Sequence, residues 1–149
     1  MIREATKNDL NRLVSLYKEY EIYENKLDER VKIDSIVKIK RRVAKLLKNK
    51  KAGIFVLEES GEILGIADCI IEIRSKEKTG VINNIIITRK ARGKGYGSQL
   101  VDFLLDYFKK NGCTKIYSFV RGKNLKAQKF WKDYGFSLSV NGYHLDKNI

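Results

Sequence analysis

Apolar residues recur at helical intervals in the first third of the chain. One such series predicts a helix that ends near Tyr20: Leu10, Leu13, Val14 and Tyr17. A second series predicts a helix that begins after Asp34 or Ser35: Ile36, Ile39, Val43, Leu46 and Leu47. A short strand is predicted at 2–5, and the polar segment 21–31 between the two helices is expected to be irregular.

From residue 53 onward the pattern changes to short apolar runs separated by turn residues. Strands at 53–57 and 63–73 flank the turn at 59–62, which predicts a β-hairpin, and a third strand follows at 81–88. The remaining predicted elements are a helix containing Leu100, Leu104, Tyr107 and Phe108, a strand at 115–120, a helix carrying Ala127, Phe130, Trp131 and Tyr134, and strands at 136–140 and 143–145. The strand, helix and strand within 81–120 imply a parallel pair joined by a right-handed crossover.

This order of elements, β-α-α-β-β-β-α-β-α-β-β, indicates an α/β (α+β) fold. The 149 residues are enough for one hydrophobic core, and no linker or repeat is visible, so a single domain over 1–149 is predicted. No stretch approaches the ~18 consecutive apolar residues of a membrane span, and no membrane association is expected. The first residues do not resemble a secretory signal, so a cytoplasmic protein is expected.

Positive charge is in large excess, with a formal net charge of +13. Such a chain attracts anions: nucleic acid, acidic protein surfaces or a phosphorylated cofactor. Much of the charge lies at 38–51, which is either a solvated helix face or a docking surface for an acidic partner. A nucleic-acid-binding domain built on this segment is an alternative, but no recognised motif supports it, and nucleic acid is not expected as a partner.

The two cysteines, Cys69 and Cys113, lie in or beside apolar segments. No Cys/His cluster accompanies them, so we expect buried free thiols rather than a disulfide. For the same reason no metal site is predicted.

A glycine-rich segment, Arg92-Gly93-Lys94-Gly95-Tyr96-Gly97-Ser98, lies between a predicted apolar strand and a predicted helix. Helix N-termini carry unpaired N–H groups and the positive end of the helix dipole, and glycines let the backbone approach an anion closely. The segment therefore suits a phosphate or pyrophosphate. The P-loop spacing is absent and the dinucleotide-binding spacing is only nearly met. The pattern R/Q-x-x-G-x-G/A is fully matched by Arg92, Gly95 and Gly97.

Together with the preceding strand residues Ile85-Ile86-Ile87, this segment resembles the acetyl-CoA motif of the GNAT superfamily of N-acetyltransferases. Asn124-Leu125-Lys126-Ala127-Gln128-Lys129-Phe130-Trp131, followed by Gly135-Phe136, is similar to the second motif of that family, N-x-x-A-x-x-[FL]-[YW]-x-x-x-G-F. The resemblance implies the GNAT fold. In that fold a mixed central sheet of about seven strands has a splayed parallel pair of fourth and fifth strands, and four helices accompany it.

The resemblance also implies acetyl-CoA as the co-substrate. Backbone groups of Ile85, Ile86 and Ile87 would pair with the pantetheine arm, and the amides from Arg92 to Ser98 would hold the pyrophosphate. Asn124 would contact the pantetheine from the opposite side. Ala127 and Trp131, from the same motif, complete the expected cofactor-binding residues.

The implied reaction is direct attack of a primary amine on the thioester in a ternary complex. Trp131 stands where the family often has a tyrosine acid, and an indole N–H is no acid near neutral pH. Tyr134, about one turn later, is the candidate replacement. Asn83 and Phe119 stand where many relatives carry a glutamate base. Candidate bases are Glu72 first, then Asp68, Glu21 and Glu24, with a water chain as the alternative.

In the family the acceptor usually sits against the first two helices, opposite the CoA. The residues expected in that region are aromatic and acidic, which suits a cationic amine: Tyr17, Tyr20, Tyr23 and Glu24. An α-amino group, with a pKa of ~7.7–8.0 against ~10.4 for lysine, would need less help from a base. An acyl-CoA-binding regulatory module without turnover is the alternative function. Many relatives are dimers, so the resemblance is compatible with a homodimer.

Overall fold

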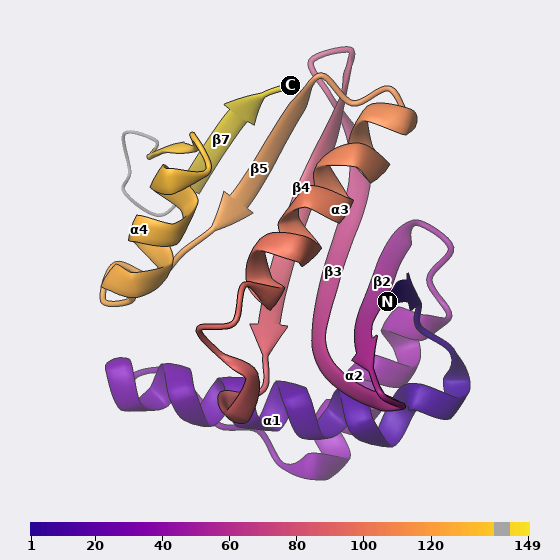
Figure 1. The fold of residues 1–149 in the computed structure, drawn as a ribbon, viewed down its shortest axis with the longest axis vertical. Helices are drawn as coiled ribbons and strands as arrows, with labels where there is room; N and C mark the ends of the chain where they lie inside the picture. The colour runs from indigo at the N-terminus through magenta and orange to yellow at the C-terminus, as the bar shows by residue number, and fades with distance from the viewer. Residues whose placement is uncertain (139–143) are drawn as a thin grey trace.

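The computed structural model describes residues 1–138 and 144–149 (Figure 1). The strands form one mixed sheet in the order β1-β2-β3-β4-β5-β7-β6. The strands are β1 (Ile2–Glu4), β2 (Ala52–Glu59), β3 (Glu62–Arg74), β4 (Glu77–Ile87), β5 (Lys115–Phe119), β6 (Ser137–Leu138) and β7 (His144–Asn148). The helices are α1 (Leu10–Leu27), α2 (Ile36–Leu47), α3 (Tyr96–Lys110) and α4 (Leu125–Asp133), with 3-10 turns at Lys7–Asp9 and Arg89–Ala91.

The predicted mixed α/β architecture with four helices and a parallel β4–β5 pair is confirmed. Within the described residues, six strands have three residues or more, so the expected number of about seven is reached only by counting the two-residue β6. The strand predicted at 136–140 is limited to β6, and residues 139–143 lie outside the described part of the chain. The strand predicted at 143–145 instead extends over 144–148.

The prediction of an irregular segment at 21–31 was wrong for its first part, because α1 continues to Leu27. Three acidic residues of this segment are buried rather than solvated: Glu21, Glu24 and Asp28. Glu21 accepts a hydrogen bond from the Asp34 amide at 2.8 Å and pairs with Arg42 of α2. The segment was predicted to be irregular because its sequence is polar. The residues that bind Glu21, namely Asp34 and Arg42, lie outside the segment and cannot be recognised from it.

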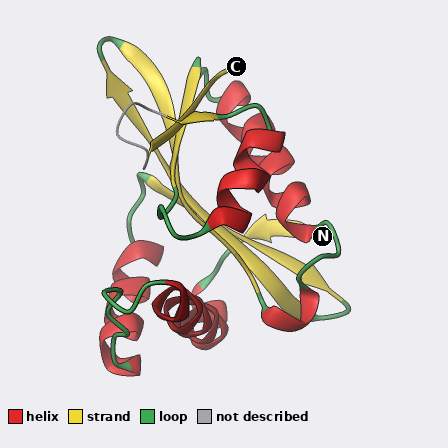
Figure 2. Ribbon diagram, turned by 90° about the vertical axis from the view of Figure 1, so that its left-hand side faces the viewer, coloured by secondary structure: helices red, strands yellow, loops and turns green. Residues whose placement is uncertain are grey.

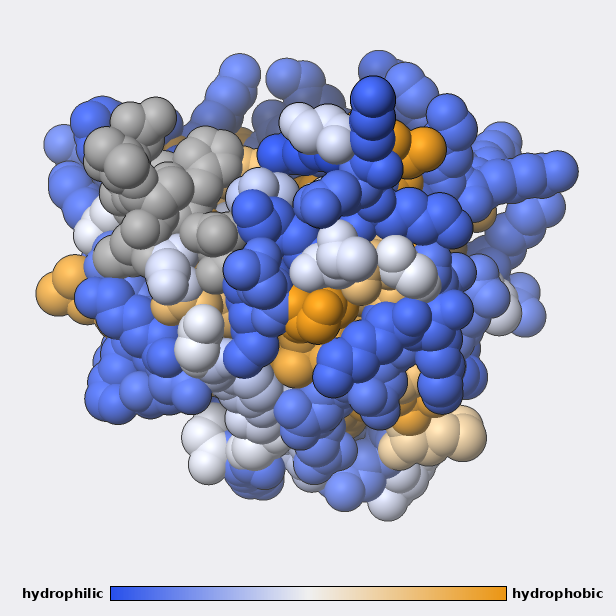
Figure 3. All heavy atoms as spheres, turned by 90° about the horizontal axis from the view of Figure 1, so that it is seen from above, coloured by the Kyte–Doolittle hydropathy of each residue, from blue (hydrophilic) through white to orange (hydrophobic). Residues whose placement is uncertain are grey.

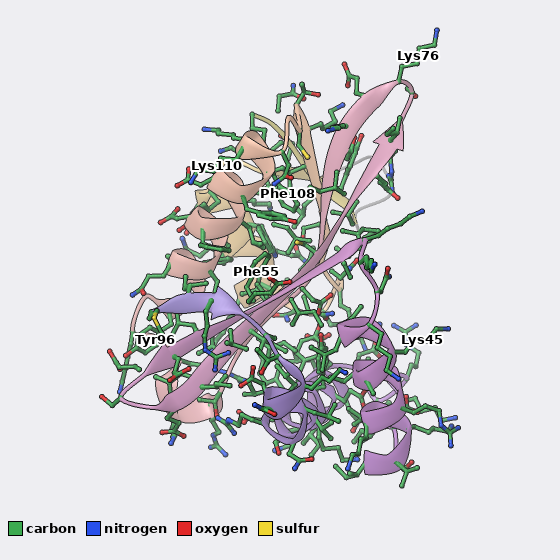
Figure 4. All side chains as sticks on the ribbon, turned by 90° about the vertical axis from the view of Figure 1, so that its right-hand side faces the viewer. Lys45, Phe55, Lys76, Tyr96, Phe108 and Lys110 are labelled. Atoms are coloured by element: carbon green, nitrogen blue, oxygen red, sulfur yellow. The ribbon has the colours of Figure 1, made fainter. Side chains whose placement is uncertain are left out.

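Helices cover both faces of the sheet (Figure 2). α1 and α2 pack on one face, where Leu13, Leu16 and Ile39 meet β-strand residues such as Ile66. α3 and α4 contribute to the core on the opposite face, whose largest fully buried side chain is Phe108. Phe108 and Phe55 point into the layer between α3 and the sheet, whereas Lys45, Lys76 and Lys110 point outward (Figure 4).

β4 changes its partner part-way along its length. It pairs with β5 in parallel only from Thr79 to Ile82. On the other side, β3 pairs Asp68 with Asn84 and Cys69 with Ile82, so the residue between them, Asn83, is an extra residue in β4. A bulge of this kind bends a strand and increases its twist. The carboxyl ends of β4 and β5 consequently diverge (Figure 1).

The face seen from the top of the molecule is almost entirely hydrophilic, with small apolar patches between long polar side chains (Figure 3). Among the described residues, no helix is both long and apolar enough to cross a membrane.

Asp9 fastens the turn that leads into α1. Its Oδ2 accepts from the Thr6 amide at 2.7 Å, and its two oxygens accept from the Arg3 guanidinium at 2.9 and 3.0 Å. The Arg3 hydrogen bonds lower the pKa of Asp9 from 3.8 to about 2. Because the folded-state pKa lies below the unfolded value, this stabilisation is complete above the unfolded pKa and is lost as the pH falls through the folded pKa.

We therefore expect Asp9→Asn to lower the free energy of unfolding by roughly 1–2 kcal/mol at pH 7 and by much less near pH 2. Urea denaturation at the two pH values measures the difference. Asp133→Asn is the matched control, since Asp133 is an exposed i,i+4 partner of Lys129 and should matter little at either pH. An equal loss at both pH values for Asp9→Asn would show that the ion pair is not its source.

Candidate functional site

A cleft of about 1170 Å³ opens where β4 and β5 diverge. One wall is the second half of β4, from Asn83 to Ile87. The other wall is the end of β5, the loop after it and α4. The C-terminal half of α1 lines the cleft with Tyr20, Tyr23 and Glu24.

The β4 wall presents backbone groups to the cleft. Pairing with β5 stops at Ile82, whose carbonyl oxygen accepts from Ser118 Oγ at 3.3 Å. Beyond this point, no described strand pairs with the β4 edge that faces the cleft. The predicted residues Ile85, Ile86 and Ile87 all line this wall. Such an edge can accept an extended ligand as an added strand.

The glycine-rich segment follows β4 and leads into α3. Gly93 and Gly95 have φ values of +76° and +80°, a conformation that favours glycine, and Gly95 is the N-cap of α3. A Cβ at either position would meet no atom within 4 Å, so the space above this turn is open. The first-turn amides of α3, including those of Gly97 and Ser98, have no earlier helical carbonyl to bind. This arrangement suits an anion.

Arg92, the first residue of the glycine-rich segment, directs its side chain toward α1. It lines the cleft, donates from Nε to the Ile87 carbonyl at 3.0 Å, and places its guanidinium 4.5 Å from the centre of the Tyr23 ring. Glu19 of α1 lies 3.8 Å from it and also accepts from the Thr88 hydroxyl at 3.0 Å. Arg92 therefore connects the glycine-rich segment to α1.

The side chains of Lys94 and Tyr96 lie outside the main cleft. Both line a smaller hollow with β2 and β3 residues, and the Tyr96 hydroxyl donates to Glu59 of β2. A ligand at the turn could therefore contact the backbone of Lys94 and Tyr96 but not their side chains.

The α4 wall is organised by Asn124. Its Oδ1 accepts from the Ala127 amide at 3.1 Å and caps α4, while its Nδ2 donates to Glu24 Oε1 at 2.8 Å. Ala127 and Trp131, both expected among the cofactor-binding residues, line the cleft beside it. Trp131 is buried and packs edge-on against Phe136, with the ring centres 4.8 Å apart.

Glu24 joins α1 to the loop between β5 and α4. Its side chain lines the cleft but its residue is only 1% exposed, and Oε2 lies 3.0 Å from Arg121 Nε. Asp28, one turn later, lies 3.6 Å from Lys123 in the same loop. Burial and the Glu24 charge raise the pKa of Tyr20 to about 12, so its hydroxyl stays protonated at neutral pH.

Neither residue predicted as catalytic lines this cleft. The Tyr134 hydroxyl donates to the Ser98 carbonyl at 3.1 Å, and burial raises the pKa of that hydroxyl. Glu72 lies on β3 opposite Thr79 and pairs with Arg74. Their catalytic roles remain predictions.

Asp68, a candidate base named from the sequence, is a buried carboxylate that contacts the cleft-lining residue Asn84. Asp68 of β3 is 2% exposed and accepts from Asn84 Nδ2 at 2.7 Å and from the Tyr17 hydroxyl. Tyr17, expected to line the acceptor region, is instead buried against this carboxylate. An aspartate within an apolar strand was the one sequence feature that pointed to this site. The bulge that sets Asn84 opposite Asp68 could not be predicted from the sequence.

The cleft carries an excess of positive charge. Its basic lining residues are Arg30, Arg92, Arg121, Lys123 and Lys126, against the acidic Glu24 and Asp28. Such a balance raises the local concentration of anionic ligands. No group of three or more His, Cys, Asp or Glu side chains that could hold a metal occurs in the described part of the chain.

The family model of the Acetyltransferase (GNAT) family matches residues 10–136. The chain therefore belongs to the GNAT acetyltransferase family, and the resemblance seen in the sequence is confirmed.

Individual relatives agree with this assignment. An uncharacterized N-acetyltransferase of Methanocaldococcus jannaschii is 29% identical over 143 residues, covering 91% of this chain and 59% of that protein. The chain thus spans less than two thirds of that relative. The uncharacterized N-acetyltransferase YhfO of Bacillus subtilis is 22% identical over 150 residues, covering 99% and 97%. The crystal structure of the PaiA N-acetyltransferase of Thermoplasma acidophilum in complex with coenzyme A has the same fold, with a TM-score of 0.81, 16% identity and coverage of 100% and 98%.

Proposed function

We propose that this protein is an acetyl-CoA-dependent N-acetyltransferase that holds donor and amine acceptor together in one ternary complex. The observation that carries the proposal is the continuity of the cleft. The open β4 edge and two residues of the glycine-rich segment, Arg92 and Gly97, line one cleft together with the C-terminal half of α1. The coenzyme A bound by the Thermoplasma relative supports an acyl-CoA ligand for this fold.

In this proposal the donor lies along β4. Backbone groups of Ile85 to Ile87 pair with the pantetheine arm, and amides of the turn from Arg92 to Ser98 hold the pyrophosphate. Asn124 mainly shapes the α4 wall of the cleft, because both ends of its carboxamide are already hydrogen-bonded, to Ala127 and to Glu24. The positive lining of the cleft complements the phosphates.

The chemistry needs no acid with a perturbed pKa. The amine nitrogen bonds to the thioester carbonyl carbon, the C–S bond breaks, and the electron pair leaves with sulfur. A backbone N–H of β4 near the bulge stabilises the oxyanion formed in between. A thiol pKa of ~8.5 makes CoA thiolate an adequate leaving group, so the presence of Trp131 in place of a tyrosine is no obstacle. The extra proton of the amine leaves through water.

The acceptor approaches from the α1 side of the cleft. Tyr20 and Tyr23 line the cleft there, with the Arg92 guanidinium over the Tyr23 ring, and Glu24 is already bound by Arg121 and Asn124. The expected attraction of a strongly cationic amine by Glu24 is therefore reduced. An amine with a low pKa, such as an α-amino group, fits this site better because it arrives largely neutral.

The test is release of free CoA thiol with acetyl-CoA and a panel of polyamines, aminoglycosides, amino acids and peptide N-termini. We expect thiol release that requires both substrates, with α-amino acceptors favoured and a rate that levels off just above the pKa of the amine. Tight binding of CoA without turnover of any amine would instead support a CoA-binding regulatory module. A rate that keeps rising far above pH 8 would contradict the preference for a low-pKa amine.

A further inference from the structure

The bulge in β4 places two asparagines at the point where β4 leaves β5. Asn83 is the extra residue, and Asn84 forms a cross-strand pair with Asp68 of β3. Both asparagines line the cleft, whereas Asp68 lies behind them and is 2% exposed. A cleft-lining amide is thus backed by a buried carboxylate.

The carboxylate determines which way the Asn84 amide points. An ionised carboxylate only accepts hydrogen bonds, so Asn84 must turn its NH₂ group toward it. The distance from Asn84 Nδ2 to Asp68 Oδ2 is 2.7 Å, and Tyr17 donates to the same oxygen. The other end of the amide, Oδ1, is then left as an acceptor on a residue that lines the cleft.

Burial makes Asp68 costly to keep for structural reasons alone. Its hydrogen-bond donors are neutral, and the nearby Arg42 guanidinium instead pairs with Glu21 and lies over the Tyr17 ring. Burying a carboxylate with neutral partners is unfavourable, and the pKa of Asp68 is raised by burial. Apolar residues in place of Asp68 and Asn84 would avoid the cost of burying a carboxylate, but they would also remove the Asn84 oxygen from the cleft.

We infer that Asp68 is a positioning residue that holds the Asn84 carboxamide so that Oδ1 accepts one N–H of the acceptor amine. This inference rests on the proposed acetyltransferase function. A neutral primary amine has two N–H bonds and one lone pair. Fixing one N–H on Oδ1 directs the lone pair toward a thioester lying along β4, and the contact strengthens as the nitrogen gains positive charge during attack.

The kinetic test compares Asp68→Asn with Tyr17→Phe. Each removes one partner of the same buried cluster, but only Asp68→Asn removes the acceptor that orients Asn84. We expect Asp68→Asn to lower kcat/KM for the amine about tenfold to a hundredfold, with KM for acetyl-CoA unchanged within about twofold. Tyr17→Phe should change kcat/KM by less than about threefold.

Asn84→Ala removes the oxygen itself and leaves the buried carboxylate in place. It should reduce kcat/KM to a similar degree, and the Asp68→Asn/Asn84→Ala double variant should be no worse than Asn84→Ala alone. Additive losses would mean that the two residues act separately and would overturn the inference. Unchanged kcat/KM in Asp68→Asn would also overturn it.

A second readout does not depend on turnover. In ¹⁵N-labelled protein the side-chain NH₂ protons of Asn84 should exchange slowly with water, and Asp68→Asn should make them exchange at least about tenfold faster. Equal exchange in both proteins would show that Asp68 does not hold the amide. If the wild-type protein acetylates no amine, the proposed function fails, while this exchange measurement still decides whether Asp68 fixes Asn84.

Discussion

Gly95→Glu is expected to weaken CoA binding by at least about a hundredfold while the protein remains folded. Gly95 is the N-cap of α3, at the turn that we propose as the pyrophosphate site, with φ of +80° and open space where a Cβ would lie. A glutamate there brings negative charge to the position of the ligand anion, and like charges held together cost several kcal/mol. Isothermal titration calorimetry with CoA measures the change in Kd.

Gly112→Glu is the matched control for this experiment. Gly112 follows the other end of α3, and its φ of +78° imposes the same backbone strain on any other residue. We expect the two variants to lose similar stability, about 1–2 kcal/mol for a left-handed residue, but only Gly95→Glu to lose CoA affinity. Gly95→Ala introduces the backbone strain without the negative charge, so its affinity for CoA should lie between those of Gly95→Glu and Gly112→Glu. A wild-type Kd in Gly95→Glu would exclude this turn as the pyrophosphate site.

Phe108→Ala is expected to lower the free energy of unfolding by about 3–5 kcal/mol. The Phe108 ring is fully buried between α3 and the sheet, directly over Gly80, where a Cβ would lie only 2.6 Å from ring atoms. Alanine would leave a cavity under α3 that the glycine cannot fill. Guanidinium denaturation followed by circular dichroism gives the loss.

Phe103→Ala is the corresponding control on the same helix. Phe103 is only partly buried and packs at the edge of the core against Phe55, with ring centres 4.8 Å apart, so its loss should be clearly smaller. Equal losses would show that the contact over Gly80 is not special. Conversely, Gly80→Ala should destabilise by about 1–3 kcal/mol because the ring has no room to move.

The features that were predicted correctly are the local elements around the cleft, which depend on short stretches of chain. The apolar run before Arg92 and the glycines at 93 and 95 indicated a strand, a turn and a helix start, and all three are present. Asn124 was expected at the start of the last helix and caps it. The family assignment followed from these segments and is confirmed by the match over 10–136.

The parts that could not be predicted depend on residues brought together from distant positions. Glu24 is buried because Arg121 and Asn124 meet it from a loop almost a hundred residues later. Arg92 points toward α1 because the Tyr23 ring and Glu19 lie there. A polar segment gives no sign of such partners, so the extension of α1 to Leu27 was missed.

By itself, the sequence determined the kinds of element, most of their order and the glycine turn at Gly93 and Gly95 that leads into α3. Hydrophobic periodicity and the left-handed backbone of glycine act over a few residues, so they are visible in the chain. Only the tertiary structure decided which charged groups face the cleft. Whether Asp68 is buried behind Asn84 depends on a one-residue bulge between β3 and β4. Strand register is a property of two strands together, and neither strand encodes it alone.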